Sequence, residues 1–184
     1  MDVKKLLTIL ILPLLTIACS ADSQTSAEQA NSAETVSSTV DIESAEDRFN
    51  FAAPELESNR LVEGAELFSQ RPLIVTFVVP DCPICVEEGP LLATAAENNS
   101  EVTYVFIHSQ ADAQSYNTYV QNSRLVGENV VHLQDDEAVL WELFGVTQQP
   151  STVLVSESGQ TTVSVGALGE DGLAQAAALV LGDS

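Results

Sequence analysis

The segment from Leu73 to Val79 is a continuous run of apolar and β-branched residues, and it constrains the fold more than any other feature of the sequence. Such a run is expected of a strand that is buried on both faces, as in a parallel sheet covered by helices. A second run extends from Val102 to Ile107, and the residues between them, Cys82 to Asn98, are predicted to form a helix. The order of strand, helix and strand predicts an α/β domain.

The rest of the chain continues this alternation. A short strand is predicted from Val130 to Leu133, and two further helices each carry an apolar stripe that should face the core. The predicted stripes are Ala113, Tyr116 and Val120 in a helix from Ala111 to Arg124, and Val139, Leu140 and Leu143 in a helix from Asp136 to Phe144, with Trp141 also in the core.

The C-terminal part is predicted to be a hairpin followed by a helix. Ser151 to Val155 and Thr161 to Val165 flank the turn residues Ser158 and Gly159, which is a hairpin signal. An alanine-rich segment from Gly172 to Leu181 predicts the last helix. We therefore expect one domain that extends over residues 47–184.

The N-terminal residues have the composition of a secretion signal. Two lysines precede an uncharged apolar run from Leu6 to Ile17, which is shorter than the roughly 20 residues that span a bilayer. The stretch from Leu15 to Cys19 resembles the lipobox of bacterial lipoproteins, which implies removal of residues 1–18 and lipidation of Cys19. The alternative is an ordinary signal peptide. Residues 19–46 are rich in Ser, Thr, Ala, Gln and Glu, and we expect them to form a flexible tether.

The charge of the chain excludes one large class of partners. Asp and Glu number 27 against 6 Lys and Arg, so the formal net charge is −21. Such acidity favours a soluble monomer. Nucleic acid is not an expected partner, because few cations remain after residue 18 to neutralise a phosphate backbone. They are Arg48, Arg60, Arg71 and Arg124.

Cys82 and Cys85 are the two cysteines that remain when Cys19 is assigned to lipid. A disulfide between them closes a ring too small to stabilise a fold much, so the pair indicates chemistry rather than structure. A cysteine that begins a helix directly after a strand faces exposed amide N–H groups, which favour its thiolate. Cys85 lies on the same helical face, within reach of a mixed disulfide at Cys82. We predict that Cys82 is the nucleophile and Cys85 the resolving thiol.

The segment from Val75 to Leu92 resembles the active-site segment of the thioredoxin superfamily, nearest the TlpA/ResA-type redoxins. Their usual motif is Trp-Cys-x-x-Cys-x-x-Glu-x-Pro, and Asp81 here replaces the tryptophan. Phe51 to Leu56 is similar to the segment that opens the family's N-terminal hairpin, and Phe144 to Thr152 to the stretch that leads to its cis-proline. The positions that match the motif are Cys82, Cys85, Glu88 and Pro90.

This resemblance implies a thioredoxin-like fold, in which helices flank a central mixed sheet and an N-terminal hairpin is added. It also implies a thiol-disulfide oxidoreductase, tethered to a membrane of the bacterial cell envelope and facing the periplasm or another extracytoplasmic space. The partners would be protein thiols or disulfides of the cell envelope and an electron donor or acceptor. No cofactor and no metal are expected.

The resemblance also implies roles for Pro150 and Glu88, and the charge of Asp81, where the chain departs from the family motif, suggests a third. Pro150 stands where the family has a cis-proline that holds backbone against the disulfide. Glu88 stands where the family has a glutamate implicated in proton handling, which a partly buried carboxyl with a raised pKa could perform; the alternative is a solvated side chain. Asp81 places a negative charge beside Cys82, which disfavours the thiolate or selects partners by their charge.

Two other functions are weighed against this one. A copper(I) metallochaperone of the SCO type usually has three residues between its cysteines and a downstream histidine ligand. This chain has two residues between its cysteines, and His108 and His132 each lie at the end of a predicted strand, where structural roles are commoner. A peroxiredoxin-like peroxidase has Thr or Ser three residues before its reactive cysteine, where this chain has Val79.

Overall fold

The strand predicted from the run at Leu73 lies at the centre of a five-stranded sheet with the order β5-β4-β3-β6-β7. This computed structural model describes residues 46–182. Every residue of β3 (Leu73–Val78) is buried, and β3 pairs in parallel with β4 (Thr103–His108) and antiparallel with β6 (Ser151–Val155). β5 (Val130–Gln134) continues the parallel part beside β4, and β7 (Thr161–Val165) lies antiparallel beside β6. The mixed central sheet is thus confirmed.

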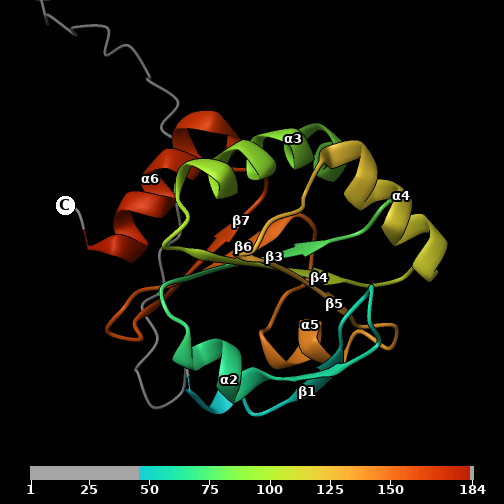
Figure 1. Ribbon diagram of the computed structural model, residues 1–184, viewed down its shortest axis with the longest axis horizontal. Helices are drawn as coiled ribbons and strands as arrows, with labels where there is room; N and C mark the ends of the chain where they lie inside the picture. Colours follow the sequence, from blue (N-terminus) through green and yellow to red (C-terminus); the bar gives the residue numbers. More distant parts are fainter. Residues whose placement is uncertain (1–45, 183–184) are drawn as a thin grey trace, which may run out of the picture. The chain divides into compact units, whose positions relative to one another are not determined.

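Helices cover both faces of this sheet (Figure 1). One face carries α3 (Pro83–Asn98), α4 (Ala113–Ser123) and α6 (Gly169–Leu181), and the other carries α2 (Gly64–Ser69) and α5 (Val139–Leu143). The crossovers from β3 through α3 to β4 and from β4 through α4 to β5 advance in the same direction across the sheet. Because both are right-handed, they place α3 and α4 on the same face.

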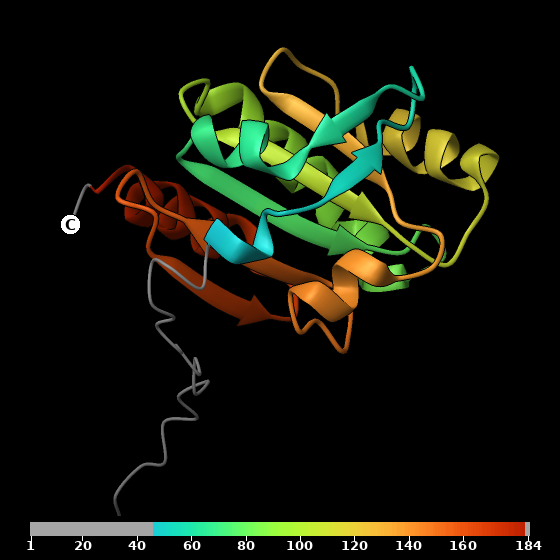
Figure 2. The same cartoon turned by 90° about the horizontal axis from the view of Figure 1, so that it is seen from below.

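The predicted N-terminal hairpin is present as a separate two-stranded sheet. It consists of β1 (Ala52–Pro54) and β2 (Leu61–Glu63), which pair antiparallel. An isolated bridge between Glu55 and Leu133 joins the hairpin region to β5. Figure 2 shows the hairpin on the same side of the sheet as α2 and α5. The fold implied by the resemblance is confirmed in its sheet, its helices and this extension.

Aromatic side chains fill the space between the sheet and α5. The ring of Phe77 in β3 lies 5.9 Å from that of Trp141 at 90° and 5.5 Å from that of Phe144. Phe144 also contacts Phe49 at 5.2 Å, and Phe49 lies 5.0 Å from Phe68 of α2. The prediction that Trp141 belongs to the core is confirmed.

Both predicted helical stripes need correction. In α4 the buried residues include Tyr116, Tyr119 and Val120, whereas Ala113 is exposed because it begins the helix, one residue after the capping residue Asp112. In α5 the side chains of Val139 and Leu143 are 57% and 36% exposed. The buried residues there are instead Leu140 and Trp141, whose amides donate to the Asp135 carboxylate and fix the orientation of this short helix.

The predictions for the N-terminal segment fall on a part of the chain that the structure does not describe. They are the signal peptide of residues 1–18, the lipidated Cys19 and the tether of residues 19–46 apart from its last residue. Between residues 46 and 182, no helix is both long enough and apolar enough to cross a membrane.

Candidate active site

Cys82 and Cys85 form a disulfide at the start of α3, with their Cα atoms 5.2 Å apart. Cys82 is the N-cap residue, Pro83 is the first helical residue, and the Cys85 amide N–H donates to Cys82 Sγ at 3.2 Å. Proline suits the first helical position, where its missing N–H would have no partner in the helix. The predicted strand, turn and helix thus present the Cys82 sulfur to the amide groups of the first turn.

The two cysteine residues differ in their exposure to solvent. Cys82 is 9% exposed and Cys85 is fully buried, while Ile84 between them is 52% exposed. Because Cys82 retains a small exposed area and Cys85 retains none, Cys82 is the cysteine of the pair that lies nearer the surface. The predicted nucleophile is therefore the more exposed residue of the pair.

Pro150 lies at the same edge of the sheet as Cys82. It directly precedes β6, and the pairing of Ser151 with Phe77 places it beside the end of β3, from which the chain leads to the cysteines. The bond between Gln149 and Pro150 is cis, as the resemblance implies. The Pro150 carbonyl accepts a hydrogen bond from the Gly166 amide at 2.8 Å, which ties this segment to the end of β7.

Glu88 is buried, so the alternative of a solvated side chain is wrong. Its Oε1 accepts hydrogen bonds from the amides of Leu168 at 2.5 Å and Gly169 at 3.2 Å, at the start of α6. Burial raises the pKa of Glu88, and these two hydrogen bonds act in the opposite direction without cancelling it. Glu88 therefore carries a carboxyl of raised pKa and links α3 to the start of α6.

Tyr119 of α4 is a further residue of the site that was not predicted. It is 3% exposed, and its hydroxyl donates to the Cys85 carbonyl oxygen at 3.2 Å. Burial raises the pKa of Tyr119, and the charge of Glu88 adds to this effect. α3 and α4 approach each other closely here, because a Cβ atom added at Gly89 of α3 would lie only 2.2 Å from Ser123 Oγ of α4. The signal available in the sequence was the spacing of Tyr119 from Tyr116 on one helical face.

His108 at the end of β4 and His132 in β5 form a buried pair. Their Nε2 and Nδ1 atoms are 2.8 Å apart, and His132 Nε2 lies 2.7 Å from the Leu125 carbonyl oxygen. Burial lowers the pKa of both, so both rings are neutral near pH 7. His132 Nε2–H then donates to Leu125, and His132 Nδ1 accepts from His108. Both nitrogens of His132 are occupied, which leaves neither free to join the cysteines as a copper ligand.

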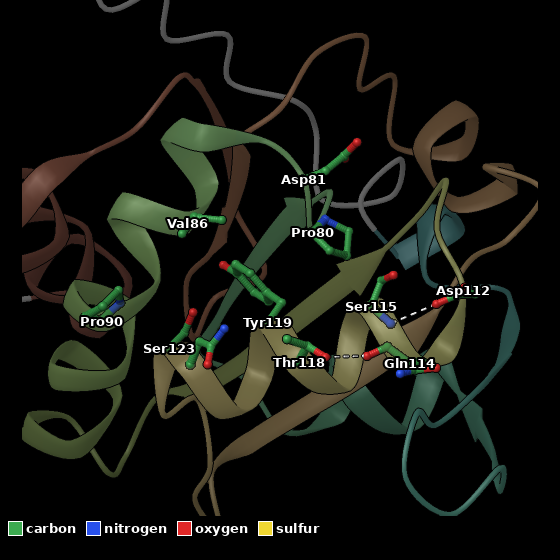
Figure 3. A pocket seen from close by; sticks show the side chains of 11 residues that line it. Pro80, Asp81, Val86, Pro90, Asp112, Gln114, Ser115, Thr118, Tyr119 and Ser123 are labelled. Carbon is green, nitrogen blue, oxygen red and sulfur yellow. Dashed lines mark hydrogen bonds between the residues drawn. The ribbon is translucent and has the colours of Figure 1, made fainter.

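A cleft of about 560 Å³ opens beside the cysteines, between α3 and α4 (Figure 3). Asp81 and Pro80 lie at its end nearest Cys82, and Val86 and Tyr119 lie in its middle. No cluster of three or more His, Cys, Asp or Glu side chains able to hold a metal ion occurs here or elsewhere in residues 46–182.

Comparisons with known proteins agree with this geometry. The sequence matches no model of a known protein family. It is 33% identical over 118 residues to the soluble secreted antigen MPT53 of Mycobacterium bovis and Mycobacterium tuberculosis, an alignment that covers 64% of this chain and 65% of the antigen. The chain thus matches slightly less than two thirds of the length of these relatives.

Solved structures extend the similarity. A secreted disulfide oxidoreductase of M. tuberculosis, described as homologous to DsbE of E. coli, shares 30% identity and a TM-score of 0.66, with 72% of this chain and 98% of that chain covered. The M. tuberculosis protein DsbF shares 26% identity and a TM-score of 0.67, with coverages of 72% and 96%. With this similarity over almost the whole of a solved relative, and with the Cys82–Cys85 disulfide at the start of α3, the chain belongs to the thioredoxin-fold thiol-disulfide oxidoreductases.

Proposed function

We propose that this protein is an extracytoplasmic thiol-disulfide oxidoreductase that exchanges disulfides with other proteins through Cys82 and Cys85. The observation that carries the proposal is the disulfide itself, which begins a helix and joins a cysteine of 9% exposure to one that is fully buried. The names of the relatives, a secreted antigen and a secreted disulfide oxidoreductase, support the compartment and the chemistry.

The proposed exchange proceeds in two balanced steps. In the reducing direction, the Cys82 thiolate attacks one sulfur of the partner's disulfide, forms a mixed disulfide and releases the partner's other sulfur as a thiolate. The Cys85 thiolate then attacks Cys82 Sγ, which closes the Cys82–Cys85 disulfide and releases the partner's second thiol. Two electrons and two protons pass to the partner. The oxidising direction is the reverse of these steps.

Glu88 and Pro150 support this exchange in our proposal. Cys85 is buried, so its thiol must lose a proton inside the protein before it can attack. Glu88 follows three residues later on the same helical face, and a carboxyl whose pKa is raised by burial is a better proton acceptor than an ordinary glutamate. Pro150 directly precedes β6, beside the end of β3 that leads to Cys82, and in our proposal the main chain of a partner pairs with this segment.

The test is to trap the mixed disulfide. A Cys85→Ser variant should accumulate covalent complexes with partner proteins that dissociate on reduction, whereas Cys82→Ser should accumulate none. Titration of the unmodified protein in a graded redox buffer should show reversible two-electron cycling. A potential near about −250 mV would indicate a reductant and one near about −120 mV an oxidant. If the pair does not cycle, the proposal fails.

The position of the protein in the cell is part of the same proposal. Export by residues 1–18 and lipidation of Cys19 would hold the domain at a membrane surface of the cell envelope, with residues 19–46 as the tether. In a bacterial host, the unmodified protein should incorporate a labelled fatty acid and fractionate with membranes. A Cys19→Ser variant should do neither, and labelling of that variant would contradict the assignment of Cys19.

A further inference from the structure

We propose that the cleft between α3 and α4 binds a segment of the partner protein that carries Lys or Arg close to the cysteine that reacts with Cys82. The inference rests on the proposed exchange function and names the class of its protein substrate: a cationic polypeptide segment.

The position of the cleft is the first argument. Its near end is formed by Pro80 and Asp81, in the loop that leads directly to Cys82 (Figure 3). The loop follows β3, which has β4 on one side and β6 on the other. The cleft lies on the β4 side, because its α4 wall follows β4, whereas Pro150 lies on the β6 side. A chain attached to Cys82 can therefore pair with the segment at Pro150 and continue into the cleft. A volume of about 560 Å³ is within the range of binding pockets.

The charge of the cleft is the second argument. Asp81 and Asp112 line it, and none of its lining residues is Lys or Arg. The Asp112 carboxylate accepts a hydrogen bond from the Ser115 amide at 2.8 Å, which lowers the pKa of Asp112 and keeps it ionised. Two carboxylates without a cation in the lining favour a ligand that brings cations, and they repel an acidic one.

The other lining residues suit an extended peptide with long cationic side chains. One wall is the face of α4 that carries Thr118 and Asn122. The Thr118 hydroxyl already donates to the Gln114 carbonyl at 2.8 Å and can still accept from a peptide N–H, and the Asn122 amide can both donate and accept. The opposite wall is apolar, with Val86 46% exposed and Pro90 beside it. Apolar surface of this kind packs against the methylene stems of Lys and Arg while their charged ends reach the carboxylates.

The test measures the rate at which the protein reduces three disulfide substrates. Two are peptides that each contain one disulfide and differ only in whether Lys or Glu flanks the cysteine, and the third is the uncharged hydroxyethyl disulfide. At low salt, the full-length reduced protein should react at least about tenfold faster with the Lys peptide than with the Glu peptide, as expected of association steered by charge. Asp112→Asn should reduce this preference about threefold and leave the rate with hydroxyethyl disulfide unchanged. Asparagine still caps the helix, so the change removes the charge and retains the fold.

Two further variants make the result specific to the cleft. Glu97→Gln removes the same charge from an exposed position near the other end of α3 and should leave the preference intact. Thr118→Lys puts a cation into the cleft and should abolish the preference.

Three results would overturn the inference: equal rates with the two peptides, equal effects of Asp112→Asn and Glu97→Gln, or an unchanged preference in Thr118→Lys. If the unmodified protein reacts normally with hydroxyethyl disulfide in any of these cases, only the docking proposal falls. If it does not react with that disulfide at all, the exchange function itself falls.

Discussion

Asp81 places an exposed negative charge directly before the reactive sulfur of Cys82. The charge opposes the α3 amide groups, which favour the thiolate. We expect Asp81→Asn to increase the thiolate fraction of reduced Cys82 at neutral pH and to speed its alkylation by iodoacetamide about three- to tenfold. Glu97→Gln, with the same change of charge far along the helix, should leave the rate unaltered. A slower reaction in Asp81→Asn would show that the aspartate assists the thiolate.

The paired His108 and His132 predict how stability depends on pH. Burial lowers the pKa of both below their ordinary value of 6.5, so the unfolded chain binds more protons than the folded protein at mildly acidic pH. The free energy of unfolding should therefore be at its full value above pH 6.5 and fall below it, by up to about 1.4 kcal/mol per pH unit for each histidine. Urea unfolding between pH 7.5 and 5 measures this slope.

A variant with Leu at both histidine positions is the matched control. Leucine retains an apolar side chain in the core and has no proton to bind, so the double variant should lose most of the slope between pH 6.5 and 5. If the slope persisted unchanged in that variant, other groups would be responsible for it.

Four candidate residues of the site could be predicted, but Tyr119 and the partners of these residues could not. Cys82, Cys85, Glu88 and Pro150 are recognisable because each follows a local signal in the sequence. The bonds from Glu88 to Leu168 and Gly169 cross most of the domain and depend on how α3 packs against α6. His108 and His132 likewise meet because the register pairs Phe106 with His132, which makes His108 a diagonal neighbour, and a sequence does not state a register.

At the scale of elements, the length of each helix or strand determined how well the sequence predicted it. β3, β4 and α3 have long apolar or helical patterns and appear close to where they were predicted. α2 and α5 have 6 and 5 residues, too few for a helical period to stand out. α2 was missed, and the stripe of α5 was wrong because the Asp135 carboxylate orients that helix.

Glu88 joins α3 to α6, and this link can be tested by replacing its carboxyl group. Glu88→Ala leaves the amides of Leu168 and Gly169 without their buried acceptor, so we expect a loss of about 1–3 kcal/mol in the free energy of unfolding. Glu88→Gln keeps an oxygen acceptor and should cost less. Urea unfolding of both variants with the cysteines oxidised provides the comparison.

The pH dependence of the same variants supplies the control. The folded carboxyl holds its proton to a higher pH than its ordinary value of 4.5, so its contribution to stability falls as the pH rises through the range above 4.5. The Gln variant should lack this component of the pH profile. If Ala and Gln were equally stable, the bonds from Glu88 to the start of α6 would contribute nothing measurable.

At the scale of the whole molecule, the net charge of −21 implies self-repulsion in the folded state. Among residues 46–182, the one salt bridge found joins Arg60 to Glu55 on the surface, so little of this charge is compensated by direct pairing. We expect the midpoint of thermal unfolding to rise between 0.05 and 1 M NaCl, because salt screens repulsion between exposed carboxylates. Sodium chloride is preferred to sulfate, which also strengthens apolar burial. A falling midpoint would mean that attractive charge pairs dominate.

The full burial of Cys85 has a consequence for kinetics. Because Cys85 is closed to other molecules, an electron donor and an electron acceptor should both react at Cys82 and cannot occupy it together. The proposed exchange should then follow a double-displacement scheme, in which one partner leaves before the other binds. Initial rates plotted in reciprocal form against one substrate at several concentrations of the other would give parallel lines, and each partner in excess would inhibit competitively against its counterpart.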